Sequence, residues 1–443
     1  MRICFLPIDN RPVCYSLAKD IAELASSLEL LIPERKYLGD LTKSADIEAL
    51  TEWIKNIENA DGIILALDTL VYGGLIPSRR SKETLEELLE RTAEIKEILK
   101  SKNAKIYAFS SIMRISNNNF NEEEKEYWKD YGKKIFEYSY NLNKFGSAQT
   151  EVPKEILEDY LNTRKRNFEI NKLYLEWQKE GLFDTLVFSK DDCAEFGLNV
   201  AEAKELEALG GFTKTGADEI PLSLLSRAIK KELKVFVEYT EPDCKNLISN
   251  YEDVSIENSV KGQLELGGFE YTETKRNADL ILIVNNFREK QGELVMGWKT
   301  EPFNKGFTPP DKPFAIADVR FANGADNEFV KKLLPKLREN ENFYGYSGWN
   351  TSANTLGSLL AGVKARFLQN KYNKEAFKKL QVIRFLDDWA YQANVREKIE
   401  KPCDISEQMK PYEECLSEIF NTNFSAEYLY PWSRKFEIEV KLS

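Results

Sequence analysis

Residues 186–197, LVFSKDDCAEFG, and residues 213–227, TKTGADEIPLSLLSR, share one pattern. In the first stretch an apolar run ends at Asp191 and Asp192, and in the second a shorter run ends, behind a glycine, at Asp218 and Glu219. A helical link separates the two, so the acid pairs occupy equivalent points of successive strand–helix units. In parallel α/β proteins the loops that follow the strands converge on one face, where ligands bind. We therefore expect these four acids to share one cleft.

The pattern continues on both sides of these stretches. About ten apolar runs end in polar or small residues and alternate with helical periodicity, which predicts a parallel α/β fold. We expect strands, each with its polar exit, within residues 3–12, 28–35, 62–80, 105–120, 186–197, 213–227, 235–243, 278–287, 313–326 and 343–357. Helices are expected at residues 46–58, 85–99, 326–338 and 353–369, and from 370 to the closing YLYPWSRKFE segment.

Two arrangements fit this order of elements. The first is a barrel-like (β/α)-repeat domain over residues 1–232, with an aromatic-rich helical insertion at 121–182, followed by a smaller α/β part with a helical C-terminal segment at 233–443. The second is a pair of open, doubly wound sheets that face one cleft. Periodicity does not separate these two arrangements.

Composition limits the classes of function. The chain has 443 residues, 42% hydrophobic and 30% charged, as in soluble globular proteins. Its net charge of -11, without a local basic patch, argues against binding nucleic acid. No apolar run approaches the ~20 residues that span a bilayer, so no membrane insertion is expected.

Targeting and cofactor signals are likewise missing from the sequence. The chain begins MRICFLPID, without the basic and apolar leader of exported proteins. Its six cysteines form no Cys-x-x-Cys pair. We therefore expect a cytoplasmic protein with reduced cysteines. No phosphate-binding glycine motif is present, and we expect no cofactor.

The chain contains no histidine. Ser-His-Asp and Cys-His catalysis and His-ligated zinc are therefore excluded. Proton transfer would fall to Asp, Glu, Tyr, Lys or Cys. Cys193 stands beside two acids, which disfavour its thiolate, so we expect it to be a core residue.

Eight segments resemble, in the same order, a bacterial family catalogued as domain of unknown function number 4127. They are LPIDNRPV (6–13), LDTLVYGGLIPSR (67–79), SKDDCAEFG (189–197), GADE (216–219), ADVRFANGAD (317–326), GWNTSANTLG (348–357), DDWAYQANVR (387–396) and PWSRKFE (431–437). The resemblance extends over nearly the whole chain. It indicates which loops matter and implies no activity.

Asp191, Asp192, Asp218 and Glu219 are the candidate catalytic residues. Cleavage of a glycosidic bond needs one carboxyl to protonate the leaving oxygen and another to stabilise or attack the sugar, and it needs no histidine. GADE also resembles the Gly-Asp-Glu of family 20 β-hexosaminidases, in which one acid orients the substrate acetamido group and its neighbour is the general acid. We assign these two roles to Asp218 and Glu219. The alternative is that both acid pairs cap helices.

Further polar side chains at strand ends are candidate substrate contacts, since Arg clamps anions, Asp and Asn accept or donate to hydroxyls, and aromatic rings stack on sugars. They are Asp9, Arg11, Asp68, Tyr72, Arg79, Arg114, Asp318, Asn323, Trp349 and Asn350, with Asp326 and Asn354 nearby. Internal salt bridges, core packing and capping of the helix at 353 by Asn350 are the structural alternatives. For Asp387 and Asp388 we favour a solvated or capping role.

We therefore expect a carboxylate-dependent glycoside hydrolase acting on a small glycoside or oligosaccharide, N-acetylhexosamine-containing substrates included. One alternative is a hydrolase or lyase that holds Mg²⁺ or Mn²⁺ through Asp9, Asp68, Asp191 and Asp192. Another is a sugar or metabolite binder without catalysis. The oligomeric state does not follow from the sequence.

Overall fold

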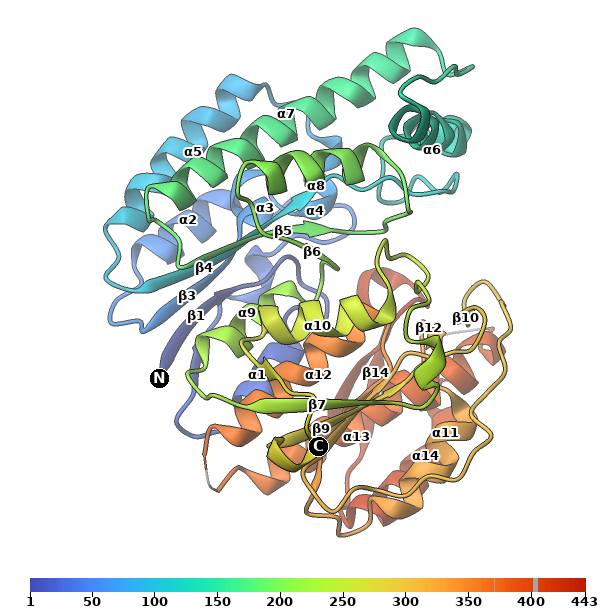
Figure 1. The fold of residues 1–443 in the computed structure, drawn as a ribbon. Helices are drawn as coiled ribbons and strands as arrows, with labels where there is room; N and C mark the ends of the chain where they lie inside the picture. Colours follow the sequence, from blue (N-terminus) through green and yellow to red (C-terminus); the bar gives the residue numbers. More distant parts are fainter. Residues whose placement is uncertain (370, 401–404) are drawn as a thin grey trace. The chain divides into compact units, whose positions relative to one another are not determined.

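The computed structural model describes residues 1–369, 371–400 and 405–443 and contains two compact units. Unit 1 consists of Met1–Tyr15, Glu29–Leu224 and Tyr251–Asp253. Unit 2 consists of Ser16–Leu28, Leu225–Asn250 and Val254–Ser443. Each unit is built around its own parallel sheet (Figure 1).

The sheet of unit 1 has six parallel strands in the order β2-β1-β3-β4-β5-β6. Its strands are β1 (Arg2–Leu6), β2 (Glu29–Leu31), β3 (Gly62–Ala66), β4 (Lys105–Ile112), β5 (Thr185–Lys190) and β6 (Thr213–Thr215). The parallel α/β prediction is confirmed. No pairing joins β2 to β6 in the described residues, so the barrel-like closure expected for this half is not detected there.

Helices cover this sheet because its strands are apolar on both faces, as parallel strands are. All five residues of β3 are buried, and Ile63 and Leu65 lie in one core with Leu99 and Trp177. Figure 1 shows the long helices α5 and α7 along one side of the sheet. The helices of this unit are α2 (Ile47–Lys55), α3 (Leu67–Val71), α4 (Leu75–Arg80), α5 (Leu85–Lys100), α6 (Trp128–Phe145), α7 (Lys154–Lys179), α8 (Leu198–Ala208) and the start of α9 (Ile220–Ala228).

Two local features of unit 1 bear on the sequence predictions. The helical insertion is present as α6 and α7, and its aromatic residues pack together as expected, with the rings of Trp128 and Tyr160 5.7 Å apart. The stretch after β3, which we treated as a simple strand exit, forms α3 and α4. Asp68 and Arg79 therefore lie on short helices that follow the carboxyl end of β3.

Unit 2 has a five-stranded parallel sheet in the order β13-β11-β9-β7-β8. Its strands are β7 (Lys234–Tyr239), β8 (Glu270–Tyr271), β9 (Leu280–Asn285), β11 (Phe314–Asp318) and β13 (Phe343–Ser347), and β10 (Gly292–Glu293) pairs separately with β12 (Phe321–Ala322). Its helices are α1 (Ser16–Ala22), α10 (Ile256–Leu266), α11 (Asn327–Leu333), α12 (Ser352–Phe367), α13 (Lys374–Arg384) and α14 (Ile405–Phe420).

The segment Ser16–Leu28 belongs to unit 2 although it lies between β1 and β2 of unit 1 in the sequence. Its helix α1 packs on α12 and α13, and the backbone N–H of Asn373 donates to the carbonyl oxygen of Leu24 at 2.9 Å. The chain therefore passes between the units more than once.

The end of the chain differs from the all-helical prediction. β14 (Ala426–Leu429) and β15 (Glu439–Leu442) form an antiparallel pair. Among the described residues, no helix combines the length and apolar character that crossing a bilayer requires.

Residues Phe385–Val395 form a π-helix directly after α13. π-Helical turns are rare and are frequent at functional sites. Here Asp388, fully buried, accepts hydrogen bonds from the backbone N–H of Gly348 at 2.7 Å and from the guanidinium of Arg384. Asp387 is also buried. The solvated or capping role that we favoured for these two acids is wrong, because they lie inside a helix that is buried on several sides.

Removal of the Asp388 carboxylate should leave Arg384 as a buried charge with only Asp387, 3.9 Å away, as an ion-pair partner in the described residues. We expect Asp388→Ala to reduce the free energy of unfolding by about 3 kcal/mol. The matched control is Glu418→Ala, which removes an exposed ion pair with Arg338 and should change stability little. Chemical denaturation of the three proteins measures this, and equal stabilities of both variants would contradict the structural role of Asp388.

Candidate functional site

Charged side chains gather at the carboxyl edge of the six-stranded sheet of unit 1. Asp9 and Arg11 follow β1, Asp68 follows β3, and Arg114 follows β4. Asp191 and Asp192 follow β5, and Asp218 follows β6. We call these residues, together with Arg79, Glu123 and Glu124, the acid–arginine cluster.

Arg11 binds acids from two loops of this edge, Asp9 in the loop after β1 and Asp218 in the loop after β6. Its Nε donates to Asp9 Oδ2 at 2.9 Å, while Nη1 and Nη2 donate to the two carboxylate oxygens of Asp218 at 3.2 and 2.5 Å. The backbone N–H of Arg11 also donates to Asp9 Oδ1 at 2.8 Å. Such bidentate contacts fix the orientation of both carboxylates.

Arg114 binds four carboxylates. Nη1 donates to Asp191 at 3.3 Å and to Asp192 at 3.0 Å, and Nε and Nη2 donate to Glu124 and Glu123, each at 2.9 Å. The guanidinium of Arg79, 1% exposed, shares the same two glutamates, at 3.1 Å from Glu124 and 3.7 Å from Glu123. Two cations therefore face more carboxylates than they can neutralise.

Burial favours the protonated forms of three acids of this cluster. Burial raises the pKa of Asp68 to about 7, against an opposing hydrogen bond from the backbone N–H of Ser111. Withdrawal from water, and then the neighbouring Asp191, raise the pKa of Asp192 to about 7. Burial also raises the pKa of Asp218 to about 6, while Arg11 opposes the shift. These three groups can exchange protons near neutral pH without an imidazole.

Asp191 and Asp192 are the most accessible of the acids that we singled out. Their side chains are 21% and 31% exposed, and Asp192 has a left-handed backbone φ of 43°. Neither caps α8, which begins after Gly197 without a side-chain cap. Asp191 also lies within electrostatic range of Asp218.

Glu219 differs from these accessible acids in its exposure. It is fully buried, and its carboxylate accepts a hydrogen bond from the backbone N–H of Ala217 at 3.0 Å. A Cβ on Gly216, whose φ is 112°, would lie 1.8 Å from Glu219 Oε1. The carboxylate therefore fills the space that the glycine leaves and stabilises the turn before α9.

Tyr72 and Cys193 are also buried. Tyr72 is 4% exposed and packs in the main core of unit 1, so its ring is not an open stacking surface in this structure. Cys193 is 7% exposed, in agreement with the core position that we expected. Burial, followed by nearby acids, raises the pKa of its thiol.

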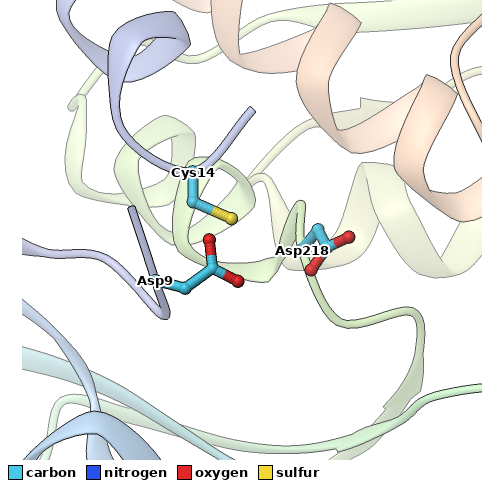
Figure 2. Close-up of side chains that lie close together, drawn as sticks. All are labelled: Asp9, Cys14 and Asp218. Atoms are coloured by element: carbon cyan, nitrogen blue, oxygen red, sulfur yellow. The ribbon is translucent and has the colours of Figure 1, made fainter. Parts of the chain in front are cut away.

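One group in the described residues has the spacing of a metal site: Asp9, Cys14 and Asp218, whose ligand atoms lie within 4.8 Å of one another (Figure 2). Asp68, Asp191 and Asp192, which we considered as Mg²⁺ or Mn²⁺ ligands with Asp9, are not in this group. Arg11 already donates to both carboxylates of the group, so a cation would have to compete with its guanidinium.

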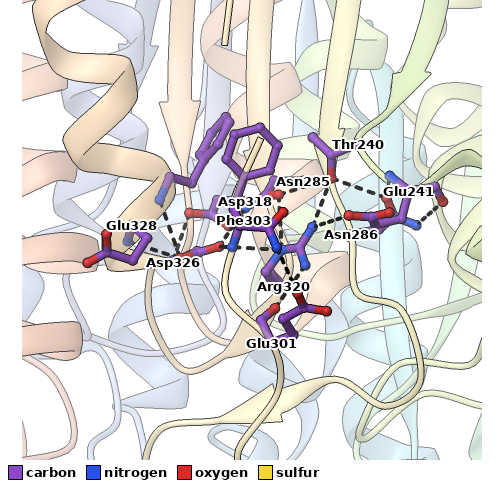
Figure 3. A network of polar contacts seen from close by, with 12 residues as sticks. Thr240, Glu241, Asn285, Asn286, Glu301, Phe303, Asp318, Arg320, Asp326 and Glu328 are labelled. Carbon is purple, nitrogen blue, oxygen red and sulfur yellow. Dashed lines mark hydrogen bonds and ion pairs between the residues drawn. The ribbon is translucent and has the colours of Figure 1, made fainter. Parts of the chain in front are cut away.

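Asp318 and Asp326, from the second set of predicted contacts, lie in a polar network of unit 2 (Figure 3). Asp318 accepts from Asn285 at 2.8 Å and from the hydroxyl of Tyr346 at 3.0 Å, and burial raises its pKa to about 7. Asp326 caps α11 and pairs with Arg320 at 3.3 Å. These acids are at most 1% exposed, so they form an internal polar network.

Asn323 follows β12, and Trp349 and Asn350 follow β13. Asn323 and Asn350 both have left-handed φ angles, 60° and 59°, and the N–H of Asn323 donates to the carbonyl oxygen of Asn350 at 2.8 Å. Thr351, and not Asn350, caps α12. Trp349 is 3% exposed, so its indole is not available as an open sugar platform in this structure.

The structure adds residues that the sequence did not indicate. Glu123 and Glu124 come from the helical insertion, where they read as surface charges, and Cys14 follows a strand exit with no metal-binding spacing. The two glutamates follow Arg114 closely in the sequence, which could have suggested them as its partners. The sequence alone does not show, however, which way this loop folds.

Buried Asp68 makes stability depend on pH. Its folded-state pKa, about 7, exceeds the ordinary value of 3.8, so its contribution is complete below pH 4 and is lost as pH rises to about 7. Asp68→Asn keeps an acceptor for Ser111 but cannot ionise. We expect its stability relative to wild type to increase between pH 4 and pH 8 by on the order of 4 kcal/mol.

Urea denaturation of both proteins across this pH range measures the effect of Asp68. The exposed Asp130→Asn on α6 is the control and should show no such trend. A stability difference for Asp68→Asn that stays constant with pH would contradict the burial argument.

Comparison with known proteins gives a family and no activity. A family model described as "Protein of unknown function (DUF4127)" matches residues 3–441. No curated protein and no solved structure matches the chain. With nearly every residue covered by that model, the chain belongs to the DUF4127 family.

Proposed function

We propose that the protein is a carboxylate-dependent glycoside hydrolase acting on a small glycoside or oligosaccharide. The observation that carries this proposal is the pair Asp191 and Asp192, two partly exposed carboxyls held side by side on Arg114 Nη1 at the carboxyl edge of a parallel sheet. Glycosidases need two acids with different protonation states, and environment sets that difference.

The two acids have different surroundings, which support different roles. Asp192 is the proposed general acid, since its raised pKa keeps a proton on it near neutral pH and its side chain reaches solvent. It would donate that proton to the glycosidic oxygen as the bond to the sugar carbon breaks. Asp191 would stabilise the positive charge that develops on the sugar, until water adds to the sugar carbon and gives a proton back to Asp192.

Asp218 would take the part of a fixed acceptor for substrate groups. Both of its carboxylate oxygens are bound by Arg11, which holds it in one orientation, and it lies in the electrostatic range of Asp191. Asp218 would orient an acetamido group or a hydroxyl of the sugar. Glu219, fully buried against the Gly216 turn, would support this loop and not donate a proton.

Replacement of Asp192 tests its role as the acid. Aryl glycosides with poor leaving groups need protonation, whereas strongly activated ones do not. Asp192→Asn should lower kcat on the former by on the order of 10²-fold to 10⁴-fold and affect the latter much less. For wild type, kcat should fall as pH rises above about 7, where Asp192 loses its proton, and the variant should lack this decline.

The assay should include N-acetylhexosaminides and the control Asp130→Asn, which changes an exposed acid on α6. Equal losses by Asp192→Asn on both kinds of leaving group would remove Asp192 as the acid. If folded wild-type protein hydrolyses none of the panel but binds sugars, the non-catalytic binding alternative replaces the hydrolase.

A metal-dependent hydrolase or lyase is the second candidate. It rests on Asp9, Cys14 and Asp218, whose ligand atoms come within 4.8 Å of one another. A thiolate beside two carboxylates suits a softer divalent ion than Mg²⁺. This candidate requires that EDTA abolish activity and that a divalent metal raise the melting temperature, and neither effect should occur for the metal-independent hydrolase.

A further inference from the structure

Three residues between β7 and α10 belong to unit 1 although the chain on either side of them belongs to unit 2. Tyr251–Asp253 lie in unit 1, whereas Leu225–Asn250 and Val254–Ser443 lie in unit 2. We call these three residues the 251–253 segment. Its contacts within unit 1 lie at the ends of β5 and β6, directly before the candidate acids.

The carboxylate of Asp253 bridges the last residues of these two strands. Its Oδ2 accepts a hydrogen bond from Lys190 Nζ at 2.5 Å, and its Oδ1 accepts one from the hydroxyl of Thr215 at 2.8 Å. Lys190 and Thr215 are register partners in the sheet, so one side chain holds both strand ends together. The Lys190 and Asp253 side chains are each 9% exposed, and with so little water to compete, their contact fixes geometry well.

The backbone of Tyr251 holds the chain on the other side of the acid pair. Its carbonyl oxygen accepts a hydrogen bond from the backbone N–H of Cys193 at 3.0 Å. Lys190 and Cys193 directly flank Asp191 and Asp192 in the sequence. The 251–253 segment therefore anchors the acid pair at both of its ends.

The conformation of the acid pair explains why such anchors matter. Asp192 has a φ of 43°, in the left-handed region that is disfavoured for residues other than glycine. Its carboxylate shares Arg114 Nη1 with that of Asp191, at 3.0 and 3.3 Å, so this one nitrogen does not fix each acid separately. The backbone on either side supplies the further constraint.

We propose that Asp253 is a positioning residue for Asp191 and Asp192. By binding Lys190 and Thr215 it sets where β5 ends, and together with the Tyr251 carbonyl it keeps Asp192 in its left-handed conformation beside Asp191. Asp253 acts through these contacts and does not touch the substrate. The anchoring stands on the contacts alone, whereas its consequence for catalysis rests on the proposed hydrolase function.

Hydrogen–deuterium exchange tests the anchoring without any turnover. Asp253→Ala removes both bridges, so the amide of Cys193 should exchange about tenfold faster than in wild type, while the amides of β3 and β4 keep their rates. Asp253→Asn keeps an oxygen that can accept from Thr215 and Lys190, so it should retain most of the protection. The control is Asp243→Ala, which changes an exposed aspartate of the 3₁₀-helix Pro242–Cys244 and should leave the exchange of Cys193 unchanged.

A second variant serves if Asp253→Ala does not fold. Thr215→Val keeps the shape of the side chain, removes its hydroxyl and leaves the ion pair of Lys190 with Asp253 intact, so exchange at Cys193 should rise by a smaller factor, about threefold. Unchanged exchange at Cys193 in folded Asp253→Ala, or in Thr215→Val, would overturn the proposal. A rise of the same size in β3 and β4 would also overturn it, since the effect would then be global.

Kinetics test the consequence for the proposed reaction. A misplaced Asp192 should resemble an absent one, so Asp253→Ala should lower kcat about 10²-fold on aryl glycosides with poor leaving groups and much less on activated ones, with little change in KM. In the Asp192→Asn background the same substitution should cost little further kcat, because the residue that it positions is already lost.

Equal losses on both kinds of leaving group, or losses that add in full to those of Asp192→Asn, would contradict the role of Asp253 in catalysis. If folded wild-type protein hydrolyses no glycoside, the hydrolase proposal fails, and the exchange of Cys193 alone decides whether Asp253 positions the acid pair. Failure of one proposal is therefore not mistaken for failure of the other.

Discussion

The contact of Arg114 with four carboxylates determines the arrangement of the candidate site in unit 1. Asp191 and Asp192 come from the end of β5, whereas Glu123 and Glu124 come from the loop before α6, and one guanidinium fixes all four. Without Arg114 these acids would repel one another. With it, and with Arg79 beside it, the acids lie together, and burial followed by the charge of Asp191 raises the pKa of Asp192 to about 7. A chain without histidine thereby obtains groups that titrate near neutral pH.

Much of the fold follows from apolar runs that end abruptly. Strands such as β3, β5 and β9 are buried along their whole length, and this leaves a plain signal in the sequence. Features without a local signal were not predictable. The π-helix at Phe385–Val395 differs from an α-helix in hydrogen-bond pattern and not in composition, and the membership of Ser16–Leu28 in unit 2 depends on packing against α12 and α13. Closure of a sheet depends on long-range pairing, which periodicity does not contain.

For the candidate site, as for the fold, the sequence predicted positions along the chain but not the environment of each residue. Acids at strand ends were found because a polar residue directly after a buried strand stands out. Their individual environments were not, since exposure and partners depend on the folded loops. From the sequence we assigned the general-acid role to Glu219, yet Glu219 is enclosed by a glycine turn, whereas Asp192 is partly exposed beside another acid. Asp387 and Asp388 looked like surface acids because π-helical burial has no charge pattern of its own.

The two units place similar residue types at the carboxyl edges of their sheets, but their polar groups are satisfied to different degrees. In unit 2, Asp318, Arg320 and Asp326 donate to and accept from one another and their neighbours, and each is at most 1% exposed. A network of this kind specifies a structure and has no open position for a ligand. In unit 1, Asp191 and Asp192 remain partly exposed. Carboxylates that reach solvent are what a ligand can use, and this difference is why the chemistry is assigned to unit 1.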